Sequence, residues 1–396
     1  MRDVESSPTP SPEVLAGTFG HHDEHLDDVF DTYRRFRTEC PVGRSDLYGG
    51  FWFLSRYDDI YRAEQSVEDY SVQPSMLLPP VGQRRPLIPL DIDPPMLQKY
   101  RRIMLPAFAP KEIDRFEPTV RRVAVDLLDR IGDGDTFDAS LEYARPFPMT
   151  VFAIMAGLPL EDLDRFNEWV ERLFYVRTRD FSETERAAAE VCDYFAETWR
   201  RRLREPPRED LIGRLLSAEI DGKPLTEEEF IDYAFLLAAA GLETTAWAVR
   251  AAMWHLAQHP EDRRRLAADP SLMAVATEEF LRCLAPVQGM ARTLKNDVEV
   301  RGRRLEAGQR VLLLFGSGNR DESVFPDPDA IKIDRLDNPH FAFGVGVHRC
   351  LGSNLGRREV RVALEELLKR FPDFHVAPDV EPVWHGVGPL PIVVER

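Results

Sequence analysis

The segment Phe341–Arg357, FAFGVGVHRCLGSNLGR, places one cysteine, Cys350, in a glycine-rich loop that precedes a predicted helix. Gly346 and Gly352 flank the cysteine, and glycines let a backbone adopt positive φ and approach a flat ligand closely. Backbone N–H groups of such a loop, followed by a helix N-terminus, can point at the sulfur and favour its thiolate form. Phe343 is expected to shield the sulfur from water. The pattern predicts that Cys350 is a ligand, and we call residues 341–352 the cysteine loop.

The segment 226–258 is the longest predicted helix, and a capping-box sequence opens it. It is apolar around nearly its whole circumference, so we expect it to be buried. Gly241 and Glu243 nonetheless lie at its centre, where glycine costs about 1 kcal/mol relative to alanine and a carboxylate needs a partner or a proton. The hydroxyl of Thr244 can bond the carbonyl of Ala240 and bend the helix. Such departures in a core helix indicate a functional site.

Together with three shorter motifs, these two segments resemble the cytochrome P450 family. The cysteine loop resembles the haem-binding loop, and residues 240–245 resemble the oxygen-binding groove of the family's central helix. The shorter motifs follow the family's order: Asp93-Pro94-Pro95 followed by Arg101, the ExxR sequence from Glu279 to Arg282, and the meander from Asn319 to Arg335. The resemblance covers most of the chain. It implies a mainly α fold with small β-sheets, a triangular helical prism holding haem b between the central helix and the cysteine-loop helix.

The resemblance also assigns roles on the two faces of the haem. Cys350 would be the iron ligand, because thiolate ligation favours cleavage of the O–O bond. Glu243 and Thr244 would deliver protons on the opposite face, next to a groove formed by Ala240 and Gly241.

Cationic groups should hold the two haem propionates, which are anionic. By resemblance these groups are Arg101, Arg292 and His348. Leu97 stands where many bacterial relatives carry a histidine, so Arg101 or another arginine would take a larger share of this contact.

Glu279 and Arg282 are spaced i,i+3 on one predicted helix face, where an exposed pair would contribute only a few tenths of a kcal/mol. In the family this pair is buried and joined by an arginine of the meander, which implies Arg335 here. The three residues would brace the cysteine loop without taking part in the chemistry.

A substrate pocket above the haem should be apolar, which favours a hydrophobic substrate. For each lining residue, ordinary core packing is an equally good interpretation. The candidates are Leu87, Ile88, Leu236, Ala239, Val287, Met290 and Trp384, with Phe174 weaker. Arg84 and Arg85 either grip a substrate carboxylate, face a propionate, or are solvated.

The chain has 396 residues and a net charge of −17, which argues against nucleic-acid binding and against docking on an anionic membrane. Its four cysteines are far apart and predict no disulfide framework. The best apolar run, 234–254, carries Glu243 and Arg250, so we expect no membrane span. Residues 1–12 are rich in Pro and Ser without an apolar core, so we expect no signal peptide and a cytoplasmic protein. Residues 1–25 are expected to form a flexible tail, and residues 26–396 a single catalytic domain.

Hydrophobic periodicity predicts more helix than strand. Helices are expected near 26–39, 97–109, 111–132, 160–176, 183–204, 226–258, 260–268, 271–284 and 353–371. Strands are expected near 51–55, 298–300, 310–314, 374–376 and 390–394.

The function that the resemblance implies is a monooxygenase that inserts one oxygen atom of O2 into a hydrophobic small molecule, such as a terpenoid or another natural product. Electrons would come from a separate ferredoxin and ferredoxin reductase, since no GxGxxG follows a strand. An acidic ferredoxin would dock on basic residues near the cysteine loop, namely Arg101, Arg102, Arg349, Arg357, Arg358 and Arg361. Oxidative coupling, ring formation or dealkylation by the same fold remain open. The Glu243–Thr244 pair argues against a peroxide-driven oxygenase and against a haem-based ligand sensor.

Overall fold

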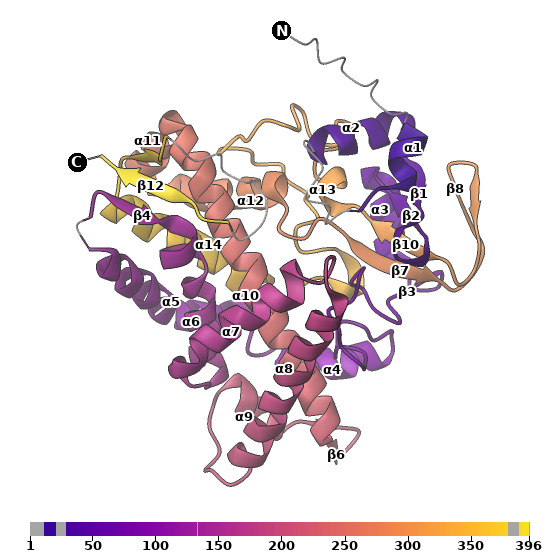
Figure 1. The fold of residues 1–396 in the computed structure, drawn as a ribbon, viewed down its shortest axis with the longest axis horizontal. Coiled ribbons are helices and arrows are strands. Elements are labelled where there is room, and N and C mark those ends of the chain that lie inside the picture. Colours follow the sequence, from indigo (N-terminus) through magenta and orange to yellow (C-terminus); the bar gives the residue numbers. More distant parts are fainter. Residues whose placement is uncertain (1–11, 21–28, 133, 379–387, 396) are drawn as a thin grey trace.

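The computed structural model describes residues 12–20, 29–132, 134–378 and 388–395 of the chain. Within these ranges the protein is mainly helical with small sheets, as the sequence predicts. Figure 1 shows helix α10 (Glu227–Gln258) running through the middle of the molecule, with other long helices around it and the largest sheet to one side.

The predicted helical segments all correspond to helices in the structure, with small shifts at their ends. They are α2 (Val29–Glu39), α4 (Met96–Met104), α5 (Pro110–Ile131), α7 (Leu163–Val170) with the π-helical turn η4 (Glu171–Tyr175), α8 (Phe181–Arg202), α10, α11 (Pro260–Ala268), α12 (Met273–Leu284) and α14 (Ser353–Arg370). Helix α4 ends earlier than expected because Pro106 has no N–H to continue the ladder.

Further short helices lie between these segments, most of them not predicted. They are α1 (Pro12–Gly17), η1 (Leu47–Gly49), α3 (Tyr57–Gln65), η2 (Ala139–Ala144), α6 (Pro146–Ala156), η3 (Leu160–Asp162), α9 (Leu211–Leu216), η5 (Pro270–Leu272), α13 (Phe315–Gly318) and η6 (Gly346–His348). Helix α1 falls within the stretch expected to be a tail, and Phe19 just after it is buried against Phe36 and Phe53. Residues 1–11 and 21–28 of that expected tail lie outside the described part.

The largest sheet has the strand order β1-β2-β10-β7-β3. Its strands are β1 (Val42–Ser45), β2 (Phe51–Leu54), β10 (Arg310–Leu313), β7 (Met290–Leu294) and β3 (Tyr70–Ser71). Strand β10 pairs parallel to β2 and antiparallel to β7, which sets Arg292 opposite Val311. The sheet thereby fixes the position of Arg292, one of the cations expected near the haem.

The other strands form one small sheet and two hairpins. The sheet has the order β11-β12-β4, made of β11 (Phe374–Val376), β12 (Pro391–Val394) and β4 (Thr136–Asp138). The hairpins pair β5 (Glu219–Ile220) with β6 (Lys223–Pro224) and β8 (Val298–Val300) with β9 (Arg303–Leu305).

Helix α10 is capped as its sequence predicts. The Thr226 hydroxyl accepts a hydrogen bond from the Glu229 backbone N–H at 3.2 Å, and the Glu229 carboxylate accepts one from the Thr226 backbone N–H at 2.8 Å. Most residues of the helix are buried. The Thr244 hydroxyl donates to the Ala240 carbonyl at 2.9 Å, and the helix continues through this point without interruption.

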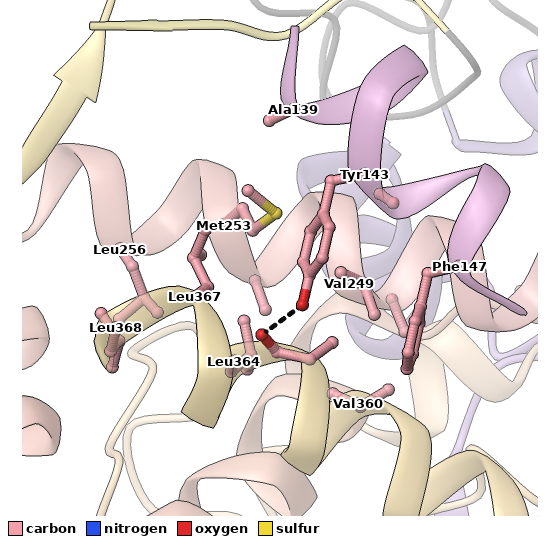
Figure 2. Close-up of a cluster of buried hydrophobic side chains, with 14 of the residues drawn as sticks. Ala139, Tyr143, Phe147, Val249, Met253, Leu256, Val360, Leu364, Leu367 and Leu368 are labelled. Atoms are coloured by element: carbon pink, nitrogen blue, oxygen red, sulfur yellow. Dashed lines mark hydrogen bonds between the residues drawn. The ribbon is translucent and has the colours of Figure 1, made fainter. Parts of the chain in front are cut away.

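The core beside the cysteine loop is the contact between α10 and α14 (Figure 2). Val249, Met253 and Leu256 of α10 belong to one buried cluster with Val360, Leu364 and Leu367 of α14, and with Tyr143 and Phe147. The Tyr143 hydroxyl donates to the Ala363 carbonyl at 2.8 Å, so this buried hydroxyl is satisfied. This packing fixes α14, which begins just after Cys350, against the central helix.

Among the described residues, no helix combines the length and the apolar character needed to cross a membrane.

Candidate active site

Cys350 is held by its own loop. Its backbone N–H donates to the Phe343 carbonyl at 2.8 Å, and the Gly352 N–H donates to its sulfur. Burial raises the pKa of the thiol, while the Gly352 N–H and the charge of Arg101 act in the opposite direction. The Cys350 side chain is nonetheless exposed, so the sulfur lies deep in the protein and faces an open space. A sulfur in this position is free to take a ligand.

Phe343 lies beneath the loop and is held there by charged neighbours. The Arg357 guanidinium is 4.3 Å from the Phe343 ring centroid and donates to Glu278 at 2.7 and 2.9 Å. His340 also contacts Glu278 at 3.0 Å. Burial alone would raise the pKa of Glu278, but these two partners lower it to about 2. The carboxylate therefore stays ionised and keeps Arg357 stacked on the ring.

The glycine of the loop at position 346 is required by its surroundings. Gly346 has φ +70°, and a Cβ there would lie 2.8 Å from the Glu64 carbonyl oxygen. Any other residue would be strained and would clash with the backbone of α3. The loop can approach α3 this closely only because it lacks a side chain here.

The centre of α10 is less covered than the rest of the helix. Ala240 is exposed and Thr244 is half-buried, while the next residue, Thr245, contacts Glu359 of α14 at 3.3 Å. Helices α10 and α14 therefore meet at Thr245, directly after this less covered segment. Gly241 leaves room beside Ala240, since a Cβ at Gly241 would meet only Phe152, at 3.8 Å.

Glu243 has the raised pKa expected of an acid in a low-dielectric site. Burial raises the pKa of its carboxyl to about 8, against the charges of Arg145 and Arg250, which lower it. Both arginines are themselves buried, and both carry guanidinium N–H groups without a protein hydrogen-bond partner. A Glu243 with this pKa is protonated at neutral pH.

The three expected propionate partners converge near the loop. Arg101 donates to the Arg349 carbonyl at 2.8 Å, and Arg292 is buried on β7, between β10 and β3. Burial, together with the charges of Arg292 and Arg101, lowers the pKa of His348 to about 3. Leu97 is fully buried and contributes no charge. Arg292 pairs with Glu64, so an anionic group at this position would be stabilised chiefly by Arg101.

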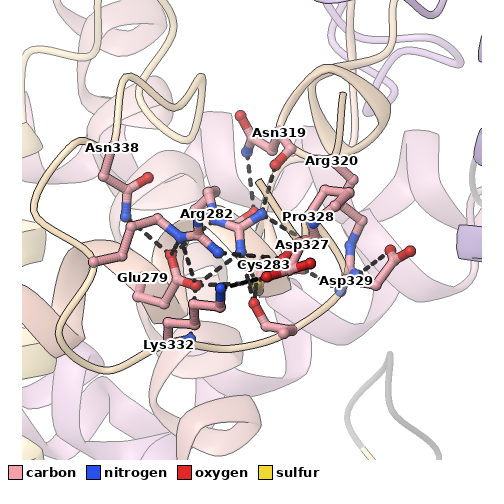
Figure 3. A network of polar contacts seen from close by, with 12 residues as sticks. Glu279, Arg282, Cys283, Asn319, Arg320, Asp327, Pro328, Asp329, Lys332 and Asn338 are labelled. Carbon is pink, nitrogen blue, oxygen red and sulfur yellow. Dashed lines mark hydrogen bonds and ion pairs between the residues drawn. The ribbon is translucent and has the colours of Figure 1, made fainter. Parts of the chain in front are cut away.

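Glu279, Arg282 and Arg335 form the expected buried network (Figure 3). Arg282 donates to both oxygens of Glu279 at 2.8 Å, and Arg335 donates to both at 3.1 Å. Asn338 and the Lys332 backbone N–H also donate to this carboxylate, at 3.1 and 2.8 Å. Burial opposes ionisation, but these partners hold the pKa of Glu279 below its usual range. The network ties α12 to the meander that leads into the cysteine loop.

The expected pocket residues fall into two groups. Leu87, Ile88 and Ala239 are buried in one apolar cluster, and Leu236 packs against it. Val287 and Met290 instead border a different cluster, the one around strands β2 and β10. Trp384 lies outside the described residues, and Phe174 packs against the first cluster.

Arg85 is paired with an acid of the protein itself. Its guanidinium makes a bidentate ion pair with Asp232 of α10, with hydrogen bonds of 2.8, 2.9 and 3.1 Å. The possible role of Arg85 as a carboxylate grip is therefore corrected: its charge is already matched, and it ties the loop before Leu87 to α10. Arg84 is exposed.

Comparison with known proteins identifies the family. A model of the family described as Cytochrome P450 matches residues 149–273 and 268–385. The chain is a cytochrome P450. It therefore belongs to a family of haem-dependent monooxygenases.

Relatives of this P450 are similar along nearly their whole length. A Bacillus subtilis protein named Polyketide biosynthesis cytochrome P450 PksS is 33% identical, covering 91% of this chain and 93% of that protein. A Mycobacterium tuberculosis protein named Methyl-branched lipid omega-hydroxylase is 34% identical, covering 97% and 96%. A solved structure of P450BioI in complex with hexadec-9Z-enoic acid ligated Acyl Carrier Protein is 30% identical, with TM-score 0.84 and coverage of 94% and 100%.

The residues of this P450 fit the haem-iron cofactor that the family implies. The exposed Cys350 thiol is a soft ligand of the kind that binds haem iron. Arg101 lies near both Cys350 and His348, and Arg292 lies near His348, so cations are available for the carboxylates of such a cofactor.

Sequence reasoning missed Glu359 of α14. This carboxyl is buried, its pKa is raised to about 8 by burial, and it accepts the hydrogen bond from Thr245. In the sequence it is one acidic residue among several in an amphipathic helix. Only the packing of α14 on α10 distinguishes it from the others.

The basic surface expected near the cysteine loop is largely matched by acids of the chain itself. Arg357 pairs with Glu278, and two further arginines of the predicted surface, also in α14, pair with α5 residues. These pairs are Arg358 with Asp114 and Glu117, and Arg361 with Glu117. Arg102 and Arg349 remain exposed.

Proposed function

We propose that this cytochrome P450 hydroxylates a hydrophobic small molecule and that Cys350 would hold the iron of haem b. The observation that carries the proposal is the exposed Cys350 thiol in a glycine loop whose Gly352 N–H donates to the sulfur. When bound, the haem iron supplies the activation of O2, and thiolate ligation favours O–O cleavage. We further propose that residues 26–396 act as a single catalytic domain, with residues 12–20 packed on it.

Proton delivery is assigned to the acid and the alcohol at the centre of α10. Glu243, with a pKa of about 8, holds a proton at neutral pH and can release it at the active site. The Thr244 hydroxyl donates to Ala240, so its oxygen is free to accept a hydrogen bond from a group at the active site. Glu359 is a second protonated carboxyl, connected to α10 through Thr245. The two acids lie on either side of Thr244.

Other chain residues hold and enclose the reactants. Arg101, Arg292 and His348 bind the propionates, and Phe343 and Gly352 control the environment of the thiolate. The Glu279–Arg282–Arg335 network positions the cysteine loop. Apolar residues exclude water from the substrate side: Leu87, Ile88, Leu236 and Ala239, with Val287 and Met290 from the sheet side.

The apolar lining and the names of the relatives together support a hydrophobic substrate with a long or branched carbon skeleton. The relatives are named for a polyketide pathway and for methyl-branched lipids. We therefore propose a polyketide, a branched lipid or a terpenoid as the substrate class. A screen of such compounds for perturbation of the Soret band would rank them.

A ferredoxin with its reductase is the proposed electron donor. The exposed Arg102 and Arg349, together with Arg101, form the cationic part of the surface nearest to Cys350. An acidic partner would be steered to them.

The test has two parts. The reduced protein with carbon monoxide should show the red-shifted Soret band of thiolate-ligated haem, and Cys350→Ser should abolish that band; an unchanged spectrum would refute the ligand assignment. Turnover with a ferredoxin system under isotopically labelled dioxygen should give a product carrying one labelled oxygen. A product that has lost hydrogen without gaining oxygen would instead indicate coupling or ring formation.

A further inference from the structure

Glu64, the penultimate residue of α3 (Tyr57–Gln65), is a buried acid with no part in the chemistry described so far. Its side chain is 2% exposed and pairs with Arg292, which is 3% exposed. The other carboxylate oxygen accepts a hydrogen bond from the Val345 backbone N–H at 3.2 Å. One carboxylate therefore contacts both a propionate-side arginine and the cysteine loop.

The contact between Glu64 and the cysteine loop is direct. A Cβ at Gly344 would lie 3.2 Å from the Glu64 carboxylate, and one at Gly346 would lie 2.8 Å from the Glu64 carbonyl. Both glycines have positive φ. No side chain can separate the acid from the backbone that leads to Cys350.

The ion pair changes the charge available at the propionate edge. Arg292 is matched by Glu64, and His348, with a pKa of about 3, is neutral at pH 7. Leu97 brings no charge where the family often has histidine. Arg101 is then the one unmatched cation among the three expected partners, facing a dianionic cofactor edge.

A buried anion near the haem also acts on the iron. Reduction adds negative charge to a buried site, and a neighbouring negative charge makes that addition less favourable in a medium of low dielectric constant. Burial raises the pKa of Glu64, but the guanidinium of Arg292 and the Val345 N–H favour the ionised form. The carboxylate directly contacts both the Arg292 guanidinium and the Val345 N–H, the two groups that stabilise its negative charge.

We propose that Glu64 is a positioning residue. It fixes the Arg292 side chain and the backbone of the cysteine loop relative to each other, and its charge lowers the reduction potential of the haem iron. This inference rests on the proposed haem site at Cys350. It assigns to α3, which contributes no ligand, control over how readily the iron is reduced.

The test compares two variants of the same helix in the holoenzyme. Glu64→Gln removes the charge at the cysteine loop. Asp59→Asn removes another buried carboxylate of α3, one that pairs with Arg301 away from the loop. Spectroelectrochemical titration should give a more positive potential for Glu64→Gln and an unchanged potential for Asp59→Asn. Haem transfer to excess apomyoglobin should be faster only for Glu64→Gln.

A third variant covers the case in which Glu64→Gln does not fold. Glu64→Asp keeps the charge but shortens the reach, so its potential should stay near that of the wild type while haem transfer becomes faster. A wild-type potential for Glu64→Gln, or wild-type haem transfer for Glu64→Asp, would overturn the inference. Neither result bears on the assignment of Cys350 as the iron ligand, which the carbon monoxide spectrum of Cys350→Ser tests separately.

Discussion

Arg335→Ala tests whether the buried network beneath the cysteine loop stabilises the fold. The substitution removes two hydrogen bonds of 3.1 Å to Glu279, one of 2.9 Å to the Pro326 carbonyl and one of 3.3 Å to the Asp327 carbonyl. The side chains of Arg335 and Glu279 are 7% and 0% exposed, so water cannot replace these contacts. Removing one partner of a buried pair costs about 3–5 kcal/mol. Because Glu279 keeps Arg282, we expect the lower end, about 3 kcal/mol.

The neighbouring residue supplies a matched control. Asp334 pairs with Arg265 at 2.7 Å, but both side chains are about half exposed, at 55% and 51%. An exposed pair contributes about 1 kcal/mol or less. Arg265→Ala should therefore destabilise the protein several-fold less than Arg335→Ala.

Urea unfolding of the holoenzyme, followed in parallel by far-ultraviolet circular dichroism and by the thiolate Soret band, measures both variants. For Arg335→Ala the two transitions should move together to lower urea, because the network connects the helical core to the cysteine loop. The reasoning is refuted if Arg335→Ala loses no more stability than Arg265→Ala, or if its Soret transition stays in place.

Three further predictions concern turnover and binding. Thr244→Ala should retain haem but divert reducing equivalents into peroxide, measured as peroxide formed per reduced cofactor consumed; unchanged coupling would contradict its role. Glu243 is protonated below its pKa of about 8 and loses that proton above it, so coupled turnover should fall as pH rises through about 8, and Glu243→Gln should flatten this fall. Arg85→Ala breaks the pair with Asp232; since Arg85 is 39% exposed, solvent screening limits the effect to about 1 kcal/mol, roughly a five-fold weaker affinity for apolar ligands in Soret titrations. Arg84→Ala should leave that affinity unchanged.

The sequence predicted the features that depend on interactions between residues close to each other in the chain. The capping box of α10 and the bond from Thr244 to Ala240 depend on residues within one or two turns of each other. Helix α6 was missed because it is apolar on all sides, so its sequence carries no helical period. Strands β2 and β10 of the large sheet were predicted, whereas β7 was missed; on one side β7 pairs with β3, which is remote in the sequence.

Site residues that belong to a sequence motif were predicted. Site residues whose role depends on how helices pack against each other were missed. Cys350 stands in such a motif, and Arg335 follows from the family resemblance. Glu64 and Glu359 carry no motif, and they matter because α3 and α14 bring them to the cysteine loop and to Thr245. The pairing of Arg85 with Asp232 joins residues 147 positions apart, which a single sequence does not reveal.

The two halves of helix α10 make different contacts, so they can be altered separately. Asp232, which pairs with Arg85, lies twelve residues before Thr244, or about 18 Å along the axis. The half beyond Thr244 is packed on α14 by the core of Figure 2. An engineer who wishes to change the proposed substrate pocket can therefore vary residues 84–88 while the half of the helix on α14 stays anchored, provided that Arg85 and Asp232 are kept.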